Sequence, residues 1–469
     1  MPGIAVGLTK DAAENERDAG RGPIASPLSV RYGIYATAVL TIAYSFSFLD
    51  RQIITLMVGP IERSLHIKDS AFALLTGGAF GIFYTVMGLP LGWLADRLSR
   101  KWIATAGITL WSLMTIGCGL AQNFVQLLLA RIGLGVGEGS LVPSAYSMLS
   151  DYFDKSRLPR ALSFFGCGIF MGIGLSMVLG GILVGALVHT PVVHVPLLGD
   201  MRSWQAVFLV VGLPALVVAL WLSTLREPVR RDHGSPSAAM RADAAQELHE
   251  LFAFLVRYKW MFVAFYAGGA LYALIAFGDA WYPELFIRTW GWNARQAGLV
   301  IGSETLVMGP IGLIFAGWYS SRLIAKGKVD ACLRLTGLGA LGISLPAILL
   351  PLSPNPVLAS VLLAPFKFFQ GFPAVLIPAA ILMTSPNRFR GQLGALFPFT
   401  NGIIGVTFGP ILPALLTDYV FQDPHALRYA LALSMGLVGP VTFAVCWIGL
   451  RQYRQCFDEL GTARSVSLS

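Results

Sequence analysis

Long apolar runs separated by short polar segments occupy most of the chain. A helix needs about 20 apolar residues to cross the hydrocarbon core of a membrane, and each run is about that long or longer. We therefore predict an all-α membrane protein. The twelve predicted transmembrane helices cover residues 33–57, 70–94, 102–121, 124–149, 160–188, 205–225, 258–283, 296–320, 331–352, 357–384, 391–418 and 427–450.

The pattern of the first six runs returns in the last six. Leu141–Ala145 in the fourth run is matched by Leu376–Ala380 in the tenth, and the fifth and eleventh runs also correspond. We therefore predict two pseudo-symmetric six-helix halves, 31–225 and 257–450, joined by a cytoplasmic linker, 226–256. Parallel halves around a central site that opens alternately to either side are typical of one class of transporter.

Polar segments flank and join the predicted halves. Residues 1–30 mix acidic and basic side chains without an apolar core, so we expect a disordered cytoplasmic tail and no cleavable signal before the first helix. Residues 451–469 are expected to form a second cytoplasmic tail. Within the linker, a short amphipathic helix is expected around Ala244–Phe254.

Composition and charge agree with a membrane protein. The 469 residues are 55% hydrophobic and 13% charged, which excludes a soluble domain of this length. Most Lys and Arg residues fall in segments on one side, so the positive-inside rule places both termini in the cytoplasm, and we expect the cell inner membrane. The net charge of +9 then serves topology and contact with anionic lipids, and no nucleic-acid partner is expected. The five cysteines lack metal-ligand spacing, so no metal or cofactor is expected.

Four charged residues lie deep inside apolar runs, namely Asp50 and Arg51 in the first helix and Arg131 and Glu138 in the fourth. A charge near the bilayer centre costs about 2.5–3.5 kcal/mol on insertion scales, so such residues are usually functional and face a wet cavity. Arg131 and Glu138 are seven residues apart and share a helix face. Asp50 and Arg51 point about 100° apart, so one can face the cavity while the other reaches a neighbouring helix. The alternative is a static salt-bridge network.

Further polar and aromatic residues lie at membrane depth in both halves. Lys367 is suited to attract an anionic group as a point charge, and the equally weighted alternative is that it snorkels to an interface or pairs with Glu304. The residues expected to line a substrate cavity are Tyr44, Phe48, Tyr84, Glu304, Lys367 and Asn401.

The loop between the second and third helices reads Gly-Trp-Leu-Ala-Asp-Arg-Leu-Ser-Arg-Lys from Gly92 to Lys101. It resembles the loop signature of the major facilitator superfamily, Gly-x-x-x-Asp-Arg-x-Gly-Arg-Lys/Arg, with Ser99 in place of the second glycine. An acid there caps a helix or bridges to its neighbour, and the basic residues anchor the turn in the cytoplasm. A plain basic loop is the alternative. We predict a cytoplasmic gate formed by Gly92, Asp96, Arg97, Arg100 and Lys101.

Three helices carry segments with a narrower resemblance, namely Phe48–Arg51 in the first, Leu110–Ser112 with Thr115 in the third, and Ala130-Arg131 with Gly135–Ser140 in the fourth. Within that superfamily, these segments resemble the Spinster family and its bacterial relatives. The resemblance implies proton-linked or facilitated movement of amphipathic lipids such as lysophospholipids and sphingoid phosphates, with Asp50 and Glu138 in proton coupling. Bacterial organic-anion symporters have similar sequences.

These observations predict a secondary active transporter rather than an enzyme, working by alternating access and coupled to protons through Asp50 and Glu138, with Arg51 and Arg131 tuning them. The preferred substrate is an amphipathic lipid-like molecule, of lysophospholipid or sphingoid type, or a hydrophobic organic anion. A proton-coupled symporter of small organic acids is the first alternative. A membrane enzyme or a channel is more distant, because the histidines lie outside the spans and His189 and His194 lack acidic partners at ligand spacing. The expected partners are substrate, protons and membrane lipids, and the protein is expected to be a monomer.

Overall fold

The computed structural model describes residues 30–154, 157–187, 192–195, 199–230, 249–386 and 389–466. Within these residues, 12 helical spans are long and apolar enough to cross a membrane, so the predicted all-α fold with twelve spans is confirmed. The spans are Val30–Leu56, Asp69–Ala95, Arg100–Leu120, Phe124–Tyr152, Arg160–Leu187, Ser203–Ser223, Lys259–Trp290, Ala294–Ala325, Ala331–Leu349, Pro356–Thr384, Gln392–Phe421 and Pro424–Leu460.

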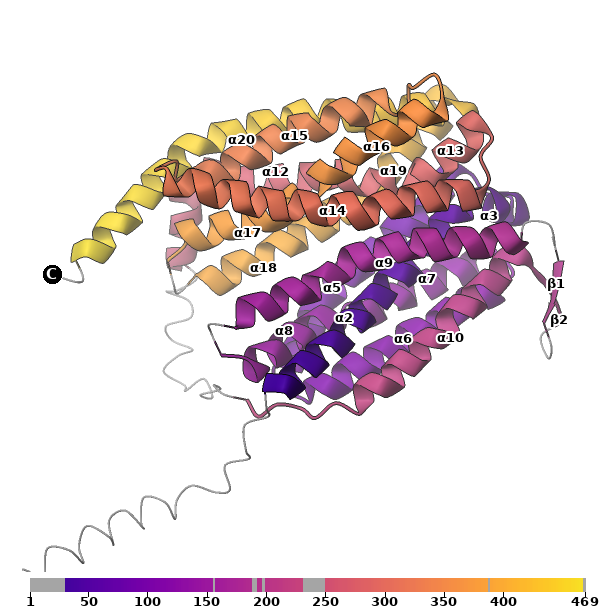
Figure 1. The fold of residues 1–469 in the computed structure, drawn as a ribbon, viewed down its shortest axis with the longest axis horizontal. Coiled ribbons are helices and arrows are strands. Elements are labelled where there is room, and N and C mark those ends of the chain that lie inside the picture. Colours follow the sequence, from indigo (N-terminus) through magenta and orange to yellow (C-terminus); the bar gives the residue numbers. More distant parts are fainter. Residues whose placement is uncertain are drawn as a thin grey trace, which may run out of the picture.

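The helices form two bundles, one from each half of the chain (Figure 1). The elements of the first half are α2 (Val30–Gln52), η1 (Ile53–Leu56), α3 (Val58–Leu65), α4 (Asp69–Ala73), η2 (Leu74–Gly78), α5 (Ala79–Ala95), α6 (Arg100–Leu120), α7 (Phe124–Glu138), α8 (Leu141–Tyr152), α9 (Leu158–Leu187), β1 (Val192–Val195), β2 (Gly199–Arg202) and α10 (Ser203–Ser223).

The second half repeats this order without a described hairpin. Its elements are α12 (Lys259–Gly278), η3 (Asp279–Trp281), α13 (Tyr282–Trp290), α14 (Ala294–Ala325), α15 (Ala331–Leu349), α16 (Pro356–Gln370), α17 (Phe372–Thr384), α18 (Arg390–Thr400), η4 (Asn401–Val406), α19 (Thr407–Leu415), η5 (Leu416–Phe421), η6 (Pro424–Ala426) and α20 (Leu427–Val466).

Two spans break at corresponding places in each half. In the first span of each half, a short 3₁₀ turn, η1 or η3, follows the long helix α2 or α12. In the fourth span, α7 ends at Glu138 and α8 begins at Leu141, as α16 ends at Gln370 and α17 begins at Phe372. Because these breaks coincide with the polar residues at membrane depth, they set the place of the candidate site.

The small antiparallel hairpin of β1 and β2 was not predicted. Val192 pairs with Arg202 and His194 with Asp200. We call the end of the molecule that carries it the hairpin end, and the opposite end, where residues 226–230 and 249–258 lie, the linker end (Figure 1).

The predicted tails and linker are described in part. Residues 1–29 and 231–248 lie outside the described residues, as do the last three of the chain. Residues 249–257 are helical, in the region where the amphipathic helix was expected. The last span does not end near residue 450, because α20 continues as a helix to Val466 and projects beyond the bundle (Figure 1).

Buried apolar side chains form a shared core at the hairpin end and separate cores at the linker end. At the hairpin end, Ile54 and Phe72 of the first half belong to one cluster with Trp281 and Phe286 of the second. Toward the linker end, one cluster is drawn almost wholly from the first half and another from the second. The halves are therefore packed together at the hairpin end.

Close backbone contact between α9 and α14 follows the same gradient. A methyl group on Gly298 would lie 2.3 Å from the backbone oxygen of Met177, and one on Gly309 would lie 2.4 Å from the Phe170 ring. Gly166 lies one turn farther toward the linker end, on the same face of α9. There a methyl group would meet no atom of the described residues within 4 Å beyond its own helix. The halves thus part toward the linker end.

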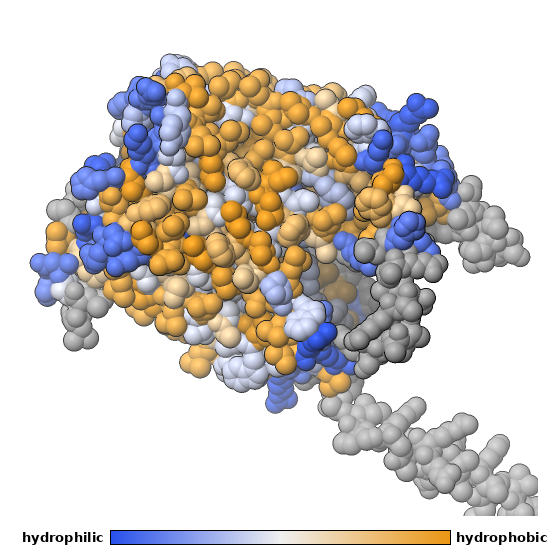
Figure 2. Space-filling view, turned by 180° about the vertical axis from the view of Figure 1, so that it is seen from behind, coloured by the Kyte–Doolittle hydropathy of each residue, from blue (hydrophilic) through white to orange (hydrophobic). Residues whose placement is uncertain are grey.

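The outer surface suits a lipid environment. Figure 2 shows hydrophobic side chains covering the middle of the molecule and hydrophilic ones gathered toward its two ends. Many large apolar side chains on the spans are exposed, including Leu220, Ile314 and Val361. In water such a surface would be an aggregation liability, whereas within a bilayer it is the expected lipid contact.

Candidate functional site

A buried ion pair joins the first and fourth spans near the middle of the first half. Arg51 donates from Nη2 to Oε2 of Glu138 at 2.6 Å, and the Ser47 hydroxyl donates to the same oxygen at 2.6 Å. Glu138 is the last residue of α7, and Arg51 is one residue before the end of α2. The two breaks in the spans therefore present these side chains to each other.

Aromatic rings enclose the Arg51 guanidinium. Its central carbon lies 4.5 Å from the ring centre of Phe48, 4.3 Å from that of Phe80 and 4.7 Å from that of Tyr84. Cation–π contacts are strongest where the cation has lost its water. The rings hold the guanidinium while leaving its charge to be balanced by Glu138.

Asp50 and Arg131 lie beside this pair. Thr115 on α6 donates its hydroxyl to Oδ2 of Asp50 at 3.2 Å. Arg131 donates to the backbone oxygens of Leu75 and Arg51, at 3.3 and 3.4 Å. Neighbouring Asp50 and Arg51 therefore reach different helices, as their angular separation predicted, and all four predicted residues meet in one cluster.

The cluster is buried, and only some of its polar atoms have hydrogen-bond partners. Asp50 and Arg131 are fully buried, and Glu138 is 1% exposed. Among the described residues, Oδ1 of Asp50, Nη1 of Arg131 and Oε1 of Glu138 have no hydrogen-bond partner. Unpaired buried polar atoms are costly. The charges of two acids and two bases can balance one another, and each acid keeps one carboxylate oxygen without a described partner.

Lys367 does not form the predicted pair with Glu304. Its ammonium donates to Asp279 at the start of η3, and Gln370 donates to the same carboxylate oxygen at 2.9 Å. Glu304 is only within electrostatic reach of Lys367, and its Oε2 is buried without a described partner. Because Lys367 is 2% exposed, it is not a snorkelling lysine. The choice between Asp279 and Glu304 depends on the rotation of the helices, which the sequence pattern leaves open.

The other predicted cavity residues divide between the halves. Tyr44 stacks on Phe165 with ring centres 4.6 Å apart, close to Phe48 and the Arg51 cluster. Asn401 begins the π-helical turn η4, and its Oδ1 is buried without a partner among the described residues. Of the aromatic shell, Phe80 and Phe165 were missed by the sequence analysis, since ordinary apolar residues in a span carry no distinguishing signal.

The predicted gate motif centres on Arg100 rather than on Asp96. Arg100 is fully buried and pairs with Asp151 at the end of α8 and with Glu227 after α10. The Asp96 side chain is exposed and forms no ion pair among the described residues, whereas its backbone oxygen accepts a hydrogen bond from Arg230. In this conformation Asp96 therefore does not tie the halves together.

The other members of the motif have separate contacts. Gly92 faces Pro143 of α8, and a methyl group on Gly92 would lie 3.6 Å from that side chain, an ordinary packing distance. Arg97 lies over the Trp93 ring, 3.8 Å from its centre. Lys101 lies 4.8 Å from the ring centre of Trp102. Asp151, Glu227 and Arg230 were missed, because charges near span ends are common and only burial distinguishes those that form a network.

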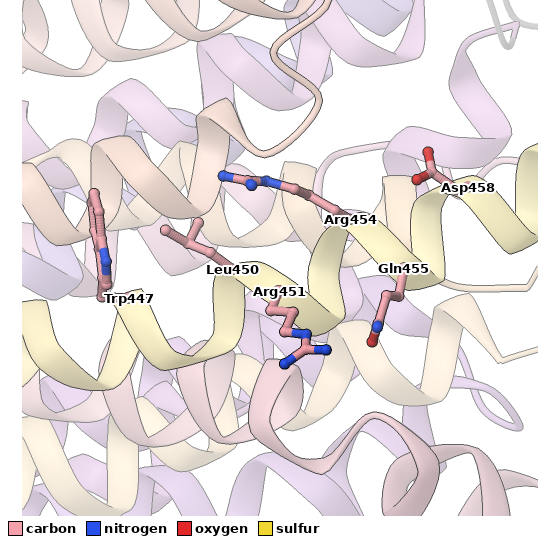
Figure 3. A pocket seen from close by; sticks show the side chains of 6 residues that line it. All are labelled: Trp447, Leu450, Arg451, Arg454, Gln455 and Asp458. Carbon is pink, nitrogen blue, oxygen red and sulfur yellow. The ribbon is translucent and has the colours of Figure 1, made fainter.

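A surface hollow on α20 is not part of this site. It has a volume of about 520 Å³, and the side chains that line it all come from one helix at the linker end (Figure 3). Arg454 in this hollow is tied to Asp330. The hollow includes no predicted site residue. It is lined by Trp447, Leu450, Arg451, Arg454, Gln455 and Asp458.

The histidines of the described residues form no candidate catalytic or metal site. His194 has one acidic neighbour, since its Nδ1 lies 2.9 Å from Oδ1 of Asp200 across the hairpin. Both side chains are exposed, and no group of three or more His, Cys, Asp or Glu side chains in the described part of the chain is placed to hold a metal ion. His189 lies outside the described residues.

Comparison with known proteins assigns the fold to a large group of membrane transporters. The model of the Major Facilitator Superfamily matches residues 40–410. An "MFS-type efflux pump" of Mycolicibacterium smegmatis is 26% identical over 432 residues, which cover 90% of this chain and 94% of that protein. A "probable galactarate/D-glucarate transporter" of Bacillus subtilis is 24% identical over 450 residues, covering 89% and 94%.

The Spinster resemblance is confirmed by both sequence and fold. "Protein spinster homolog 1" of Rattus norvegicus is 32% identical over 215 residues, or 45% of this chain and 38% of that protein. A crystal structure of a bacterial homologue of the human lysosomal transporter Spinster, in an inward-facing and unoccupied conformation, superposes with a TM-score of 0.70. It is 22% identical and covers 91% of this chain and 97% of its own.

Proposed function

This chain belongs to the Major Facilitator Superfamily and is a transporter rather than an enzyme, and from that premise we propose that it is a proton-coupled secondary active transporter working by alternating access. Its preferred substrate is an organic anion with a large apolar part, of lysophospholipid or sphingoid type. The observation that carries the proposal is the buried Arg51–Glu138 pair inside an aromatic shell.

We assign the structure to an inward-facing state of the inner membrane protein, with both termini in the cytoplasm. The basic residues of the linker end, such as Arg100, Arg230 and Arg454, support that orientation under the positive-inside rule. The shared core at the hairpin end and the separate cores at the linker end support an opening toward the cytoplasm. A monomer is sufficient for this cycle, because both halves come from one chain.

The way Glu138 is held supports proton coupling. Its Oε2 accepts hydrogen bonds from Arg51 and Ser47, and its Oε1 is buried without a partner among the described residues. A proton on Glu138 would remove the counter-charge of Arg51. The guanidinium would then be available to an anionic group of the substrate, and proton and anion would bind together without net charge.

Asp50 and Arg131 complete the cycle as we propose it. Asp50 lies within electrostatic reach of both Glu138 and Arg131, so the charge on one changes the proton affinity of the others. Alternating access changes the hydration of all four. A proton can drive transport only if it binds the two conformations with different affinity, and a cluster at the breaks of two spans is well placed to feel that change.

The aromatic shell favours an amphipathic substrate. Phe48, Phe80 and Tyr84 around Arg51 offer apolar surface beside one cation, which suits an anionic head group attached to a hydrocarbon. In the second half, Lys367 is already neutralised by Asp279, so a small polyhydroxylated acid would find few free polar partners there.

Small organic acids remain the second candidate. The observation in their favour is that several relatives covering most of the chain are named as transporters of galactarate, D-glucarate or D-galactonate. Thermal-shift and uptake measurements with lysophospholipid and with D-galactonate distinguish the two. Stabilisation and uptake with D-galactonate alone would reject the lipid-like substrate.

The coupling site is tested by Glu138→Gln in proteoliposomes. The amide cannot carry the proton, so accumulation driven by an imposed pH difference should be lost while exchange between equal compartments largely persists. Asp200→Asn, which makes the same change on an exposed carboxylate of the hairpin, is the matched control and should accumulate substrate normally. Accumulation by Glu138→Gln at the wild-type level would return the cluster to a structural role.

A further inference from the structure

Three carboxylates converge on one arginine at the hairpin end. Arg288 on α13 donates from Nη2 to Glu62 at 2.8 Å and to Asp69 at 2.9 Å, from Nη1 to the other oxygen of Asp69 at 2.9 Å, and from Nε to Glu284 at 2.7 Å. The four side chains are between 4% and 14% exposed. We call these four residues the Arg288 cluster.

The Arg288 cluster connects the two halves. Glu62 on α3 and Asp69 on α4 belong to the first half, whereas Glu284 and Arg288 belong to the second. Nearby, Asp418 of η5 accepts a hydrogen bond from the backbone amide of Ser70 at 2.8 Å, which is a second tie between the halves. Opening of the hairpin end therefore requires the Arg288 cluster to come apart.

The cluster holds more acid than base. With all groups ionised, three negative charges would face one positive charge in a largely buried place, and like charges in contact are unfavourable. Nη2 of Arg288 donates to both Oε2 of Glu62 and Oδ1 of Asp69, so these two carboxyl groups lie against each other. Two ionised carboxylates in contact repel, whereas a proton on one of them lets it donate a hydrogen bond to the other. Oε1 of Glu62 is buried and has no hydrogen-bond partner among the described residues.

We propose that a proton shared between Glu62 and Asp69 latches the hairpin end closed around Arg288. With the proton, the Arg288 cluster has two negative charges and one positive charge, and the two acids attract through a hydrogen bond. Without it, they repel across the same contact while Arg288 can neutralise only one. This proton-binding site is separate from the Asp50 and Glu138 cluster. It rests on the proposed function only in requiring that the two halves move apart at the hairpin end.

No other described group near the cluster replaces that proton. Asp418 is held by the Ser70 amide, and Arg202 donates to Ser64. The remaining charged or titratable side chains on the adjoining elements are Arg63, His66, Lys68, Arg295, Asp423, His425 and Arg428, of which all but Arg428 are exposed to solvent at this end. Exposed charges are screened and interact weakly with a buried group.

The latch has a defined dependence on pH. Burial first, and then the hydrogen bond with Asp69, raise the pKa of Glu62 from 4.5 to about 9 despite the opposing effect of Arg288. When the hairpin end opens, Glu62 meets water and returns toward its ordinary pKa. The closed state binds the proton more tightly, so it is favoured at low pH and loses that advantage as pH rises through about 9. Between the two pKa values of Glu62, 4.5 in water and about 9 in the closed state, the ratio of closed to open molecules falls about tenfold for each unit that the pH rises.

Closure of the hairpin end would therefore take up a proton at neutral pH, and reopening would release it on the same side. The proton would not cross the membrane by this route. It would bias the cycle toward the inward-facing state when the hairpin side is acidic, which is a different effect from coupling at Glu138.

The test measures the separation of the halves at the hairpin end as a function of pH. Spin labels at Lys68→Cys and His425→Cys, with exposed Cys167 replaced by Ser, report the closed and open populations by double electron–electron resonance. All proteins carry Asp50→Asn and Glu138→Gln, so the central acids cannot titrate. Between pH 6 and 8, the closed-to-open ratio should fall about 100-fold in this background.

Glu62→Gln provides the decisive comparison. The amide can still donate to Asp69 and accept from Arg288 but cannot lose a proton, so its closed-to-open ratio should stay constant over the same pH range. Asp69→Asn should behave in the same way, and Asp200→Asn should keep the full slope. A flat ratio in the parent background, or a tenfold slope per pH unit that survives Glu62→Gln, would overturn the latch. Because the central acids are absent from all samples, failure of proton coupling at Glu138 leaves this result unaffected.

Discussion

At the scale of single residues, the two halves place their buried charged side chains in the same way. In each half an acid near the end of the first long helix lies close to a base on the fourth span, Asp50 near Arg131 and Asp279 beside Lys367. Breaking a buried pair by removing one partner leaves an uncompensated charge, which typically costs 3–5 kcal/mol. Each of these residues is therefore coupled to its partner whatever else it binds.

That coupling gives a test for Lys367. Lys367→Met should lower the free energy of unfolding by up to about 3–5 kcal/mol, because Asp279 keeps only Gln370. The double change Asp279→Asn with Lys367→Met should recover most of the loss. Thermal unfolding in detergent measures both effects.

Substrate affinity in the same variants separates the roles of Lys367. If Lys367 attracts the substrate anion, the double variant should be stable but bind more weakly. Glu304→Gln is the control for a pairing role, and it should leave the stability within about 0.5 kcal/mol of wild type because Glu304 has no direct ion pair with Lys367. A double variant that is stable and binds normally would assign Lys367 to structure alone.

Sequence reasoning identified charged residues better than their partners. Asp50, Arg51, Arg131 and Glu138 were recognisable because a charge in an apolar run is expensive wherever it points. The partner of Lys367 was not, because both Asp279 and Glu304 lie within reach and helix rotation decides between them. The acids that surround Arg288 lie near span ends, where charge is ordinary, so no signal marked them before folding brought the halves together.

At the scale of whole helices, close packing in the first half depends on glycines. The backbones of α6 and α7 approach most closely around Gly107 and Gly137. A methyl group on Gly137 would lie 2.7 Å from the backbone oxygen of Gly107 and 2.8 Å from the backbone nitrogen of Trp111. Rigid backbone on both sides cannot yield easily, and the neighbouring Glu138 would move with its helix.

Gly137→Ala should therefore destabilise the protein by about 1–3 kcal/mol through overpacking and weaken proton-driven uptake by displacing Glu138. Gly166→Ala is the matched control, because its methyl group would meet no described atom within 4 Å. There the better helix propensity of alanine should leave stability unchanged or raise it by up to about 1 kcal/mol. Equal loss in both variants, measured by thermal unfolding, would contradict the packing argument.

The number and approximate position of the membrane spans could be predicted from the sequence. The places where the helix is interrupted inside a span could not. Hydropathy marks a span by its apolar length and does not sense where the backbone changes its hydrogen-bond register. The 3₁₀ turns η1 and η3 and the π-helical turns η2 and η4 were therefore invisible. Such irregular turns often mark functional positions in helices, and η1 and η3 here follow Asp50 and include Asp279.

Movement of the two halves is the property of the whole molecule on which the proposed function depends. If the hairpin end must open in every cycle, a covalent link across it should stop transport. A Cβ atom on Gly185 would lie 2.8 Å from that of Arg295, about 1 Å closer than the mean separation in disulfides. Both residues lie near helix ends, where a shift of that size is small.

Gly185→Cys with Arg295→Cys, in a Cys167→Ser background, should lose more than about 90% of its uptake on oxidation and regain it on reduction, because a locked hairpin end prevents alternation. The other four cysteines are buried and should not interfere. Gly166→Cys and Gly394→Cys at the linker end should stay reactive toward maleimide in the locked protein. Full uptake by the oxidised pair would contradict a cycle that opens the hairpin end.

The internal repeat was sufficient to predict two halves, but not which end holds them together. Both ends carry charged networks, around Arg100 at one and Arg288 at the other. Alternating states of one sequence differ by only a few kcal/mol, so the pattern of residues is compatible with either. The separate cores at the linker end are what support the proposed inward-facing state.

The seam of close contact between α9 and α14 lies nearer the hairpin end of α14 than its linker end. Close contact occurs around Gly298 and Gly302, so about 8 residues of α14, or about 12 Å, lie on the hairpin side, and about 23 residues, or about 35 Å, extend to the other end. Turning about this seam by about 10° would displace the short arm by about 2 Å and the long arm by about 6 Å. If the halves rock about this seam as the proposed cycle requires, the mouth at the linker end opens wider than the mouth at the hairpin end, and the narrower mouth sets the size limit for the substrate.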